Sequence, residues 1–140
     1  MGSNVGTVKA FHEAFNKHDW PAIEKLVAPD CVWTDARGIS YKGPQGVAQE
    51  YSKGWADAFS DGKITDAKFY DAGDTVVTEF VGRGTNDGQM GPIAATGKHV
   101  DLPYVEIYHF GSDGKVKSGS AYCDMFGLMV QMGLAEAPKM

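Results

Sequence analysis

The 140-residue sequence has few cysteines, a deficit of positive charge and no long apolar run. Its two cysteines, Cys31 and Cys123, are too few and too far apart for a disulfide framework or a cysteine-rich zinc site. Thirteen basic against eighteen acidic side chains give a net charge of −5, so no basic stripe is present to bind nucleic-acid phosphates or anionic lipid. No apolar stretch approaches the ~18 residues that span a bilayer, and the N-terminus lacks the order of a signal peptide. These features predict a cytoplasmic protein with no nucleic-acid or membrane partner.

Phosphate-binding and metal-binding patterns are also missing. The glycines between residues 84 and 97 do not lead from a strand into a helix, as those of nucleotide-binding loops do. His12, His18 and His99 have no histidine or glutamate at a spacing typical of metal ligands. We therefore expect a mobile glycine-rich loop at the mouth of a pocket, and no metal.

Apolar residues at helical spacing predict three helices in the first half of the chain, over residues 5–16, 21–27 and 43–59. Asp19 is suited to cap the second of them. A short strand is predicted over residues 31–35, which are rich in β-forming side chains.

The second half of the chain is rich in β-branched and aromatic residues, separated by turn-forming segments. The pattern predicts four strands in meander order over residues 64–70, 75–85, 99–110 and 116–126, then an apolar helical turn over residues 128–134. Helices followed by hairpin-linked strands predict one α+β domain over residues 1–140, with residues 1–4 and 135–140 flexible at its ends. The concave face of such a sheet would enclose a ligand pocket, and its broad apolar face would be covered in a homodimer or higher homo-oligomer.

The aromatic side chains are too numerous to belong to the core alone in a chain of this size. We expect some of them to line a cavity for a flat, hydrophobic, oxygenated ligand. The candidates are Phe15, Trp33, Tyr51, Trp55, Tyr104, Tyr108 and Tyr122.

Asp124 is an acidic residue in an apolar context, between Cys123 and Met125. A buried carboxylate without a partner is costly, and such a group is suited to take a proton from carbon and return it to oxygen. The other interpretation is that Asp124 caps the helical turn that follows it, since aspartate is a favoured N-cap residue. The residues alone support both interpretations equally.

Three further polar residues are candidates. Asp35 ends the first predicted strand, and it either takes part in catalysis or initiates the turn over residues 36–38. Glu106 and His109 differ in parity on one strand, so both cannot face a pocket unless a bulge intervenes. His109 would orient or protonate a carbonyl oxygen if it is the one that faces inward.

Four stretches in the second half of the chain match the motifs of one family in order and spacing. They are GRGTNDG (82–88), ATGK (95–98), DGKV (113–116) and YCDMFGLMVQMGL (122–134). On these stretches the chain resembles the SnoaL-like polyketide cyclases, which have the nuclear transport factor 2-like fold. The resemblance implies a cone-shaped barrel of strongly curved antiparallel sheet packed against three N-terminal helices.

The resemblance also implies a function. SnoaL-like cyclases close a ring by intramolecular aldol condensation on a polyketide ester, without metal or cofactor, and the aspartate of the last motif, here Asp124, acts as acid and base. The ligand would then be a hydrophobic carbonyl compound. Many relatives carry histidine where this chain has Asn86 and tryptophan where it has Ser120, and both positions belong to the expected pocket. Asn86 and Glu106 are therefore added to the aromatic residues as substrate-binding candidates.

Two alternatives stay open. By position, Asp35 resembles the general base of the ketosteroid isomerases, another branch of the same fold, with Phe11 at their tyrosine position and Glu106 near their second acid. An isomerase or hydrolase of this fold would use Asp35. A non-catalytic domain that binds small molecules would need neither Asp35 nor Asp124.

Overall fold

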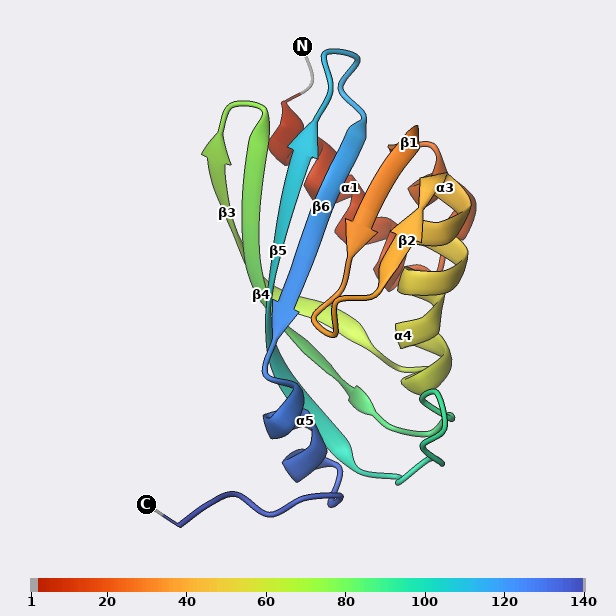
Figure 1. Cartoon of the computed structure of the whole chain (residues 1–140), viewed down its shortest axis with the longest axis vertical. Coiled ribbons are helices and arrows are strands. Elements are labelled where there is room, and N and C mark those ends of the chain that lie inside the picture. Colours follow the sequence, from red (N-terminus) through yellow and green to blue (C-terminus); the bar gives the residue numbers. More distant parts are fainter. Residues whose placement is uncertain (1–2, 140) are drawn as a thin grey trace.

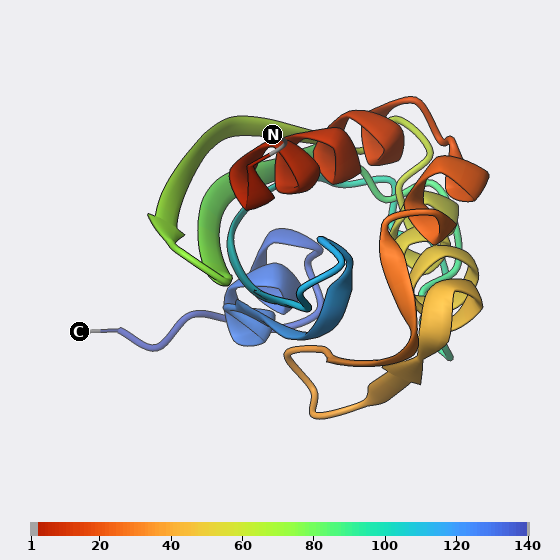
Figure 2. The same cartoon turned by 90° about the horizontal axis from the view of Figure 1, so that it is seen from above.

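The computed structural model describes residues 3–139, in which one six-stranded sheet curls around a layer of helices (Figures 1 and 2). The helical segments are α1 (Asn4–Asn16), α2 (Trp20–Glu24), α3 (Gly43–Gln45), the π-helical η1 (Gly46–Ser52), α4 (Lys53–Ala58) and α5 (Met125–Gln131). The strands are β1 (Val27–Thr34), β2 (Ser40–Lys42), β3 (Lys63–Ala72), β4 (Thr75–Thr85), β5 (His99–Phe110) and β6 (Val116–Cys123). The predicted α+β class is confirmed.

The strands follow the order β2-β1-β6-β5-β4-β3. Strands β3 to β6 pair antiparallel in the predicted meander, and the bounds of β4 and β5 agree with the prediction. Two expectations are wrong: β1 runs parallel to β6, so the sheet is mixed, and the barrel stays open, with β2 and β3 as its edges. No hairpin joins β1 to β6, so turn chemistry in the sequence does not dictate the direction of that pair. The edge strand β3 is interrupted by a register shift between Thr65 and Lys68, where Asp66 has a φ of 55°.

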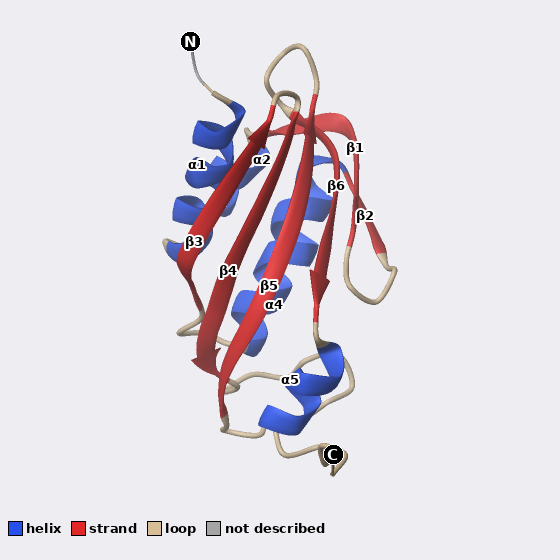
Figure 3. Cartoon of the chain, turned by 90° about the vertical axis from the view of Figure 1, so that its left-hand side faces the viewer, coloured by secondary structure: helices blue, strands red, loops and turns tan. Residues whose placement is uncertain are grey.

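Helices α1 and α4 lie on one side of the sheet, and Figure 3 shows both behind the long strands. The second helix ends at Glu24 rather than at Val27, because Val27 already begins β1. Strand β1 continues through Pro29, and its pairing with β6 shifts between Val27 and Val32. Proline has no N–H to donate and is tolerated at such an irregularity. At the other end of the chain, β6 stops at Cys123 and the closing helix begins earlier than predicted.

The predicted third helix is present as α3, η1 and α4 in succession (Figure 1). Its middle is π-helical, a rare conformation that often occurs at functional sites. Tyr51 and Ser52, the last two residues of η1, are both buried although they are consecutive. The helix therefore directs two adjacent polar side chains into the interior.

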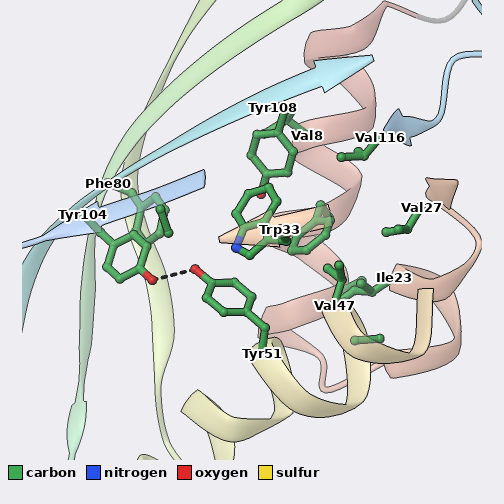
Figure 4. Close-up of a cluster of buried hydrophobic side chains, with 14 of the residues drawn as sticks. Val8, Ile23, Val27, Trp33, Val47, Tyr51, Phe80, Tyr104, Tyr108 and Val116 are labelled. Atoms are coloured by element: carbon green, nitrogen blue, oxygen red, sulfur yellow. Dashed lines mark hydrogen bonds between the residues drawn. The ribbon is translucent and has the colours of Figure 1, made fainter. Parts of the chain in front are cut away.

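The core is built around Trp33, which is fully buried (Figure 4). Its indole ring lies 4.9 Å from the ring of Tyr108 and 5.4 Å from that of Tyr51, centroid to centroid. Gly119 pairs with Trp33 across the parallel β1–β6 junction. A Cβ atom at this glycine would overlap Trp33 Cζ3 and lie 2.6 Å from the carbonyl oxygen of Ile107. Gly119 thus allows the indole ring to lie against β6.

We predict that Gly119→Ala lowers the free energy of unfolding by about 1–3 kcal/mol, because the added methyl group overpacks the core against Trp33. Urea denaturation would measure the change. Gly54→Ala is the matched control, since a Cβ atom there meets nothing within 4 Å among the described residues and alanine favours the helix. Equal stability of Gly119→Ala and the wild type would contradict this account of the core.

Candidate active site

The alternation of β5 separates the two polar residues that the sequence singled out on this strand. Glu106 faces the interior and is 3% exposed. His109 lies half-buried on the other face, where its Nδ1 is 3.0 Å from the Thr75 hydroxyl. The predicted difference in orientation is confirmed, and it is Glu106 that points toward the concave side.

Glu106 is the centre of a buried polar network that we call the Glu106 cluster: Glu106, His12, Tyr51, Tyr104 and Tyr108. The hydroxyl of Tyr108 donates to Oε1 at 2.7 Å, and that of Tyr51 donates to Oε2 at 3.1 Å. The hydroxyls of Tyr51 and Tyr104 are 2.5 Å apart (Figure 4). His12 Nε2 lies 3.4 Å from Oε1, within ion-pair range but without hydrogen-bond alignment. Hydroxyl groups therefore link Glu106 in a chain through Tyr51 to Tyr104.

Burial determines the protonation of the three tyrosines. It raises the pKa of Tyr51, Tyr104 and Tyr108 well above the usual value of 10, and the neighbouring charge of Glu106 raises each of them further. The phenols therefore keep their protons at neutral pH and serve as hydrogen-bond donors. These donors offset part of the cost of removing the Glu106 carboxyl group from water.

One face of the Glu106 cluster borders a space of about 80 Å³, which we call the inner cavity. The polar and charged residues among its lining are Tyr51, Ser52, Lys63, Arg83, Tyr104 and Glu106. The remaining wall is largely apolar and comes from Phe11, Phe15, Trp55, Phe59, Ile64, Phe80, Val100, Leu102 and Leu128.

A larger space of about 380 Å³, which we call the outer pocket, lies on the other side of the tyrosine pair. Tyr51, Trp55 and Tyr104 line both spaces. The outer pocket is otherwise bordered by Asp35, Arg37, Tyr41, Glu50, Asp57 and the loop around residues 89–93, together with Met125 and Met129. The hydroxyl chain thus connects a solvent-facing pocket to a buried carboxyl group.

Asp35 lies at the wall of the outer pocket, but its carboxylate is already occupied. It accepts five hydrogen bonds: two from backbone N–H groups, two from the Arg37 guanidinium and one from the Tyr41 hydroxyl. Burial raises the pKa of Asp35, but the bonds from Arg37, Ile39 and Tyr41 outweigh it and hold that pKa below its usual value. A carboxylate offers about four lone-pair sites, so Asp35 has little capacity left to accept a proton from a ligand.

Asp124 does not line either space. It is the N-cap of α5, its Oδ1 accepts a hydrogen bond from Gly127 N at 2.8 Å, and the residue is exposed. The expected burial of Asp124 is wrong, because β6 ends just before it and the side chain turns back onto the first turn of α5. The structure agrees with the capping interpretation.

The aromatic candidates divide into three groups. Phe15, Tyr51, Trp55 and Tyr104 line the inner cavity. Trp33 and Tyr108 are fully buried beside the Glu106 cluster and pack against each other. Tyr122 is 56% exposed, so its expected place in the pocket is wrong: it alternates with the buried Ala121 on β6 and faces solvent.

Asn86 is fully buried, but it organises the glycine-rich loop instead of contacting a cavity. Its Nδ2 donates to the carbonyl oxygens of Ala58 and Gly88, both at 3.0 Å. Its Oδ1 accepts from the backbone and hydroxyl of Thr96 at 2.8 and 2.9 Å. The side chain therefore fastens both ends of the loop to the end of α4.

Two residues of the site were not identified from the sequence. His12 follows Phe11 on the apolar face of α1 and is buried there, with its ring 5.1 Å from that of Phe80. A histidine on an otherwise apolar helical face could have indicated a buried polar residue of the site. The sequence around Ser52 contained no such indication, because the burial of Ser52 depends on the π-helical turn that it ends.

Within residues 3–139, histidine, cysteine and acidic side chains form no group of three that could hold a metal ion. In the same range, no helix has the length and apolar character to span a bilayer.

Fold and site together define a small α+β domain with a buried carboxyl group in its concave interior. The sequence matches the SnoaL-like domain over residues 8–119, and the chain therefore belongs to that family. No curated protein matches the chain.

The fold is also that of solved structures. A proposed SnoaL-like polyketide cyclase from Jannaschia sp. CCS1 is 18% identical, with a TM-score of 0.85 over 95% of this chain and 93% of that one. A proposed polyketide cyclase from Pseudomonas putida KT2440 is 21% identical, with a TM-score of 0.82 over 94% of this chain and 98% of that one. A protein with a ketosteroid isomerase-like fold from Catenulispora acidiphila is 22% identical, with a TM-score of 0.77 over 94% of this chain and 97% of that one. The predicted cone fold is confirmed as an open version of it.

We predict that Asn86→Asp destabilises the glycine-rich loop and lowers the free energy of unfolding by at least about 2 kcal/mol. The substitution replaces the donor that Ala58 and Gly88 share with an acceptor. Chemical denaturation and limited proteolysis of residues 87–97 would measure the effect. Gln45→Glu makes the same chemical change at an exposed site outside the loop, where the side chain has no hydrogen-bond partner among the described residues, and it should leave both readings unchanged.

Asp35 should contribute stability that depends on pH. Its pKa lies below the unfolded value of 3.8, so its contribution is complete above that value and is lost as the pH falls through the folded pKa. The difference in unfolding free energy between the wild type and Asp35→Asn should therefore be constant between about pH 7 and 5 and shrink below 3.8. A difference that grows on acidification would contradict the hydrogen-bond assignment.

Proposed function

We propose that the protein is a cofactor-independent cyclase that closes a ring in a polyketide or related hydrophobic carbonyl compound by intramolecular aldol addition. The observation that carries the proposal is the position of Glu106, a buried carboxyl group that lines the inner cavity and is linked through Tyr51 to Tyr104. Membership of the SnoaL-like family supports a role of the cyclase or isomerase type.

The first step is removal of a proton from a carbon flanked by carbonyl groups. The Glu106 carboxylate accepts hydrogen bonds from two tyrosines and has His12 at ion-pair distance, so lone-pair sites remain for a substrate proton. Glu106 is the general base in this proposal.

The second step forms the carbon–carbon bond. The enolate carbon attacks a carbonyl carbon of the same molecule, and the electron pair of that carbonyl moves to its oxygen. Tyr51 and Tyr104 line both spaces, and in this proposal their hydroxyls donate to the developing oxyanion. Glu106 returns its proton to the alkoxide through the tyrosine chain, so the net reaction is an isomerisation that consumes no other reactant.

The two aspartates that the sequence suggested are less suited to this chemistry. Asp124 lies on the surface as a helix cap. Asp35 borders the outer pocket, but five hydrogen bonds occupy its carboxylate. A reaction of the ketosteroid isomerase type with Asp35 as base would require those bonds to break first.

Exchange of deuterium from solvent into activated ketones and β-keto esters tests the proposal without knowledge of the natural substrate. Glu106→Gln keeps the size of the side chain and should slow exchange about 10²-fold or more, the contribution typical of a general base. Asp124→Asn is the matched control and should exchange at the wild-type rate. Thermal melting would establish that each variant is folded.

Two outcomes would refute the proposed function. Exchange that survives in Glu106→Gln and is lost in Asp35→Asn would move the base to the outer pocket. Binding of the ketones without any exchange in the wild type would favour a non-catalytic binding domain.

A further inference from the structure

We infer that the inner cavity is a binding subsite for an uncharged aliphatic tail of the ligand, and that the absence of a side chain at Gly82 keeps this subsite open. The inference rests on the proposed function only for the position of the reactive carbonyl group, which lies beside the Glu106 cluster. It adds the nature of the rest of the ligand.

The lining of the inner cavity selects for hydrocarbon. Its walls beyond the Glu106 cluster are mostly aromatic and aliphatic, with Phe15, Phe80, Leu102 and Leu128 among them. Lys63 and Arg83 also line it, but their charged groups are bound elsewhere, to the carbonyl oxygen of Asn16 and to Asp66 and Asp101. Its volume of about 80 Å³ is several times the ~10–15 Å³ that one water molecule requires. Apolar cavities hold water poorly and take up small hydrocarbons. The space is therefore suited to an alkyl chain.

The inner cavity adjoins the outer pocket. Tyr51, Trp55 and Tyr104 form a wall common to both. A ligand whose carbonyl group lies beside the Glu106 cluster would place that group where the two spaces adjoin, with its tail in the inner cavity. The subsite thus begins where the reactive group ends.

Ser52 supplies an independent sign of a ligand. Its side chain lines the inner cavity and the residue is 1% exposed, yet its Oγ has no hydrogen-bond partner among residues 3–139. A buried hydroxyl without a partner costs about 1–3 kcal/mol. An oxygen atom carried by the ligand tail would accept a hydrogen bond from Ser52 and remove this cost.

Gly82 has no local reason to be glycine. It lies on β4 in the same alternation as the buried Thr78 and Phe80, so a side chain there would point toward the inner cavity. A Cβ atom would meet its nearest neighbour, the Leu102 carbonyl oxygen, at 3.8 Å, an ordinary contact. At Gly84, by contrast, a Cβ atom would lie 3.0 Å from both Asp61 Oδ1 and Gly62 Cα. Close packing explains why residue 84 is glycine. At residue 82 the absence of a side chain instead keeps the cavity open.

A series of methyl 3-oxoalkanoates of increasing chain length tests the subsite. Dissociation constants would be measured by tryptophan fluorescence, since Trp55 lines both spaces. In the wild type, affinity should rise about fourfold per added methylene group until the tail fills the inner cavity, and then level off. Gly82→Val should abolish this rise and leave the affinity for the shortest ester unchanged. Val81→Ile adds bulk to the same strand on the opposite face and should behave as the wild type.

Ser52→Ala tests the hydroxyl separately from the volume. It should weaken binding of an ester with a second keto group in its tail by about two- to tenfold, the range of a single hydrogen bond, and leave esters with plain alkyl tails unaffected. Equal effects on both kinds of ester would overturn the role of Ser52 as a ligand contact.

The subsite and the proposed function fail in different ways. An affinity that does not rise with chain length in the wild type, or a rise that survives Gly82→Val, overturns the subsite whatever the exchange experiment shows. The rise should persist in Glu106→Gln, because binding of the tail needs no proton transfer. A normal chain-length series without deuterium exchange would support the subsite and refute the catalytic role of Glu106.

Discussion

Burial of the Glu106 carboxyl group is the constraint on which the interior of the cone depends. A carboxylate removed from water is destabilising by several kcal/mol unless nearby groups hydrogen-bond to it. Here the donors come from separate parts of the chain: Tyr108 from the same strand, and Tyr51 from the π-helical end of η1. The sheet and the third helix must therefore keep a fixed relative position, because a displacement of either leaves the carboxyl group unpaired.

The carboxyl groups of Asp35 and Glu106 lie in opposite chemical environments. Asp35 has an arginine, a tyrosine and two backbone N–H groups, and its pKa is held below the usual range. Glu106 is surrounded by neutral phenols, with spare capacity on both oxygens. Such a difference in surroundings is how proteins assign distinct chemical roles to identical groups. The ionised aspartate stabilises the turn at the rim of the outer pocket, whereas the buried glutamate keeps free lone-pair sites beside the inner cavity.

Local pattern predicted the parts of the fold that local interactions determine. The bounds of β4 and β5 and the extent of the third helix follow from side-chain periodicity and turn residues, and so does the fact that Glu106 and His109 face opposite sides of β5. Which of the two faces inward did not follow from the sequence. The parallel pairing of β1 with β6 joins segments far apart in the chain, and no turn in the sequence reports it. The catalytic interpretation of Asp124 assumed a burial that the structure does not show, because the apolar neighbours of Asp124 in the sequence are not its neighbours in space. His12 and Ser52 belong to the site only because helices deliver them to the same interior as β5, which periodicity alone does not show.

The irregular edge strand β3 limits how copies of this domain can associate. A long, regular edge strand offers unpaired backbone groups to any strand that approaches, and it invites aggregation. In β3 the ladder breaks between Thr65 and Lys68, Asp66 takes up a left-handed conformation, and Arg83 of the neighbouring strand binds its carboxylate at 2.7 Å. The exposed backbone is thereby divided into short pieces flanked by charge. Continuous extension of the sheet across this edge is disfavoured, so an assembly of several copies would be built through the faces of the cone.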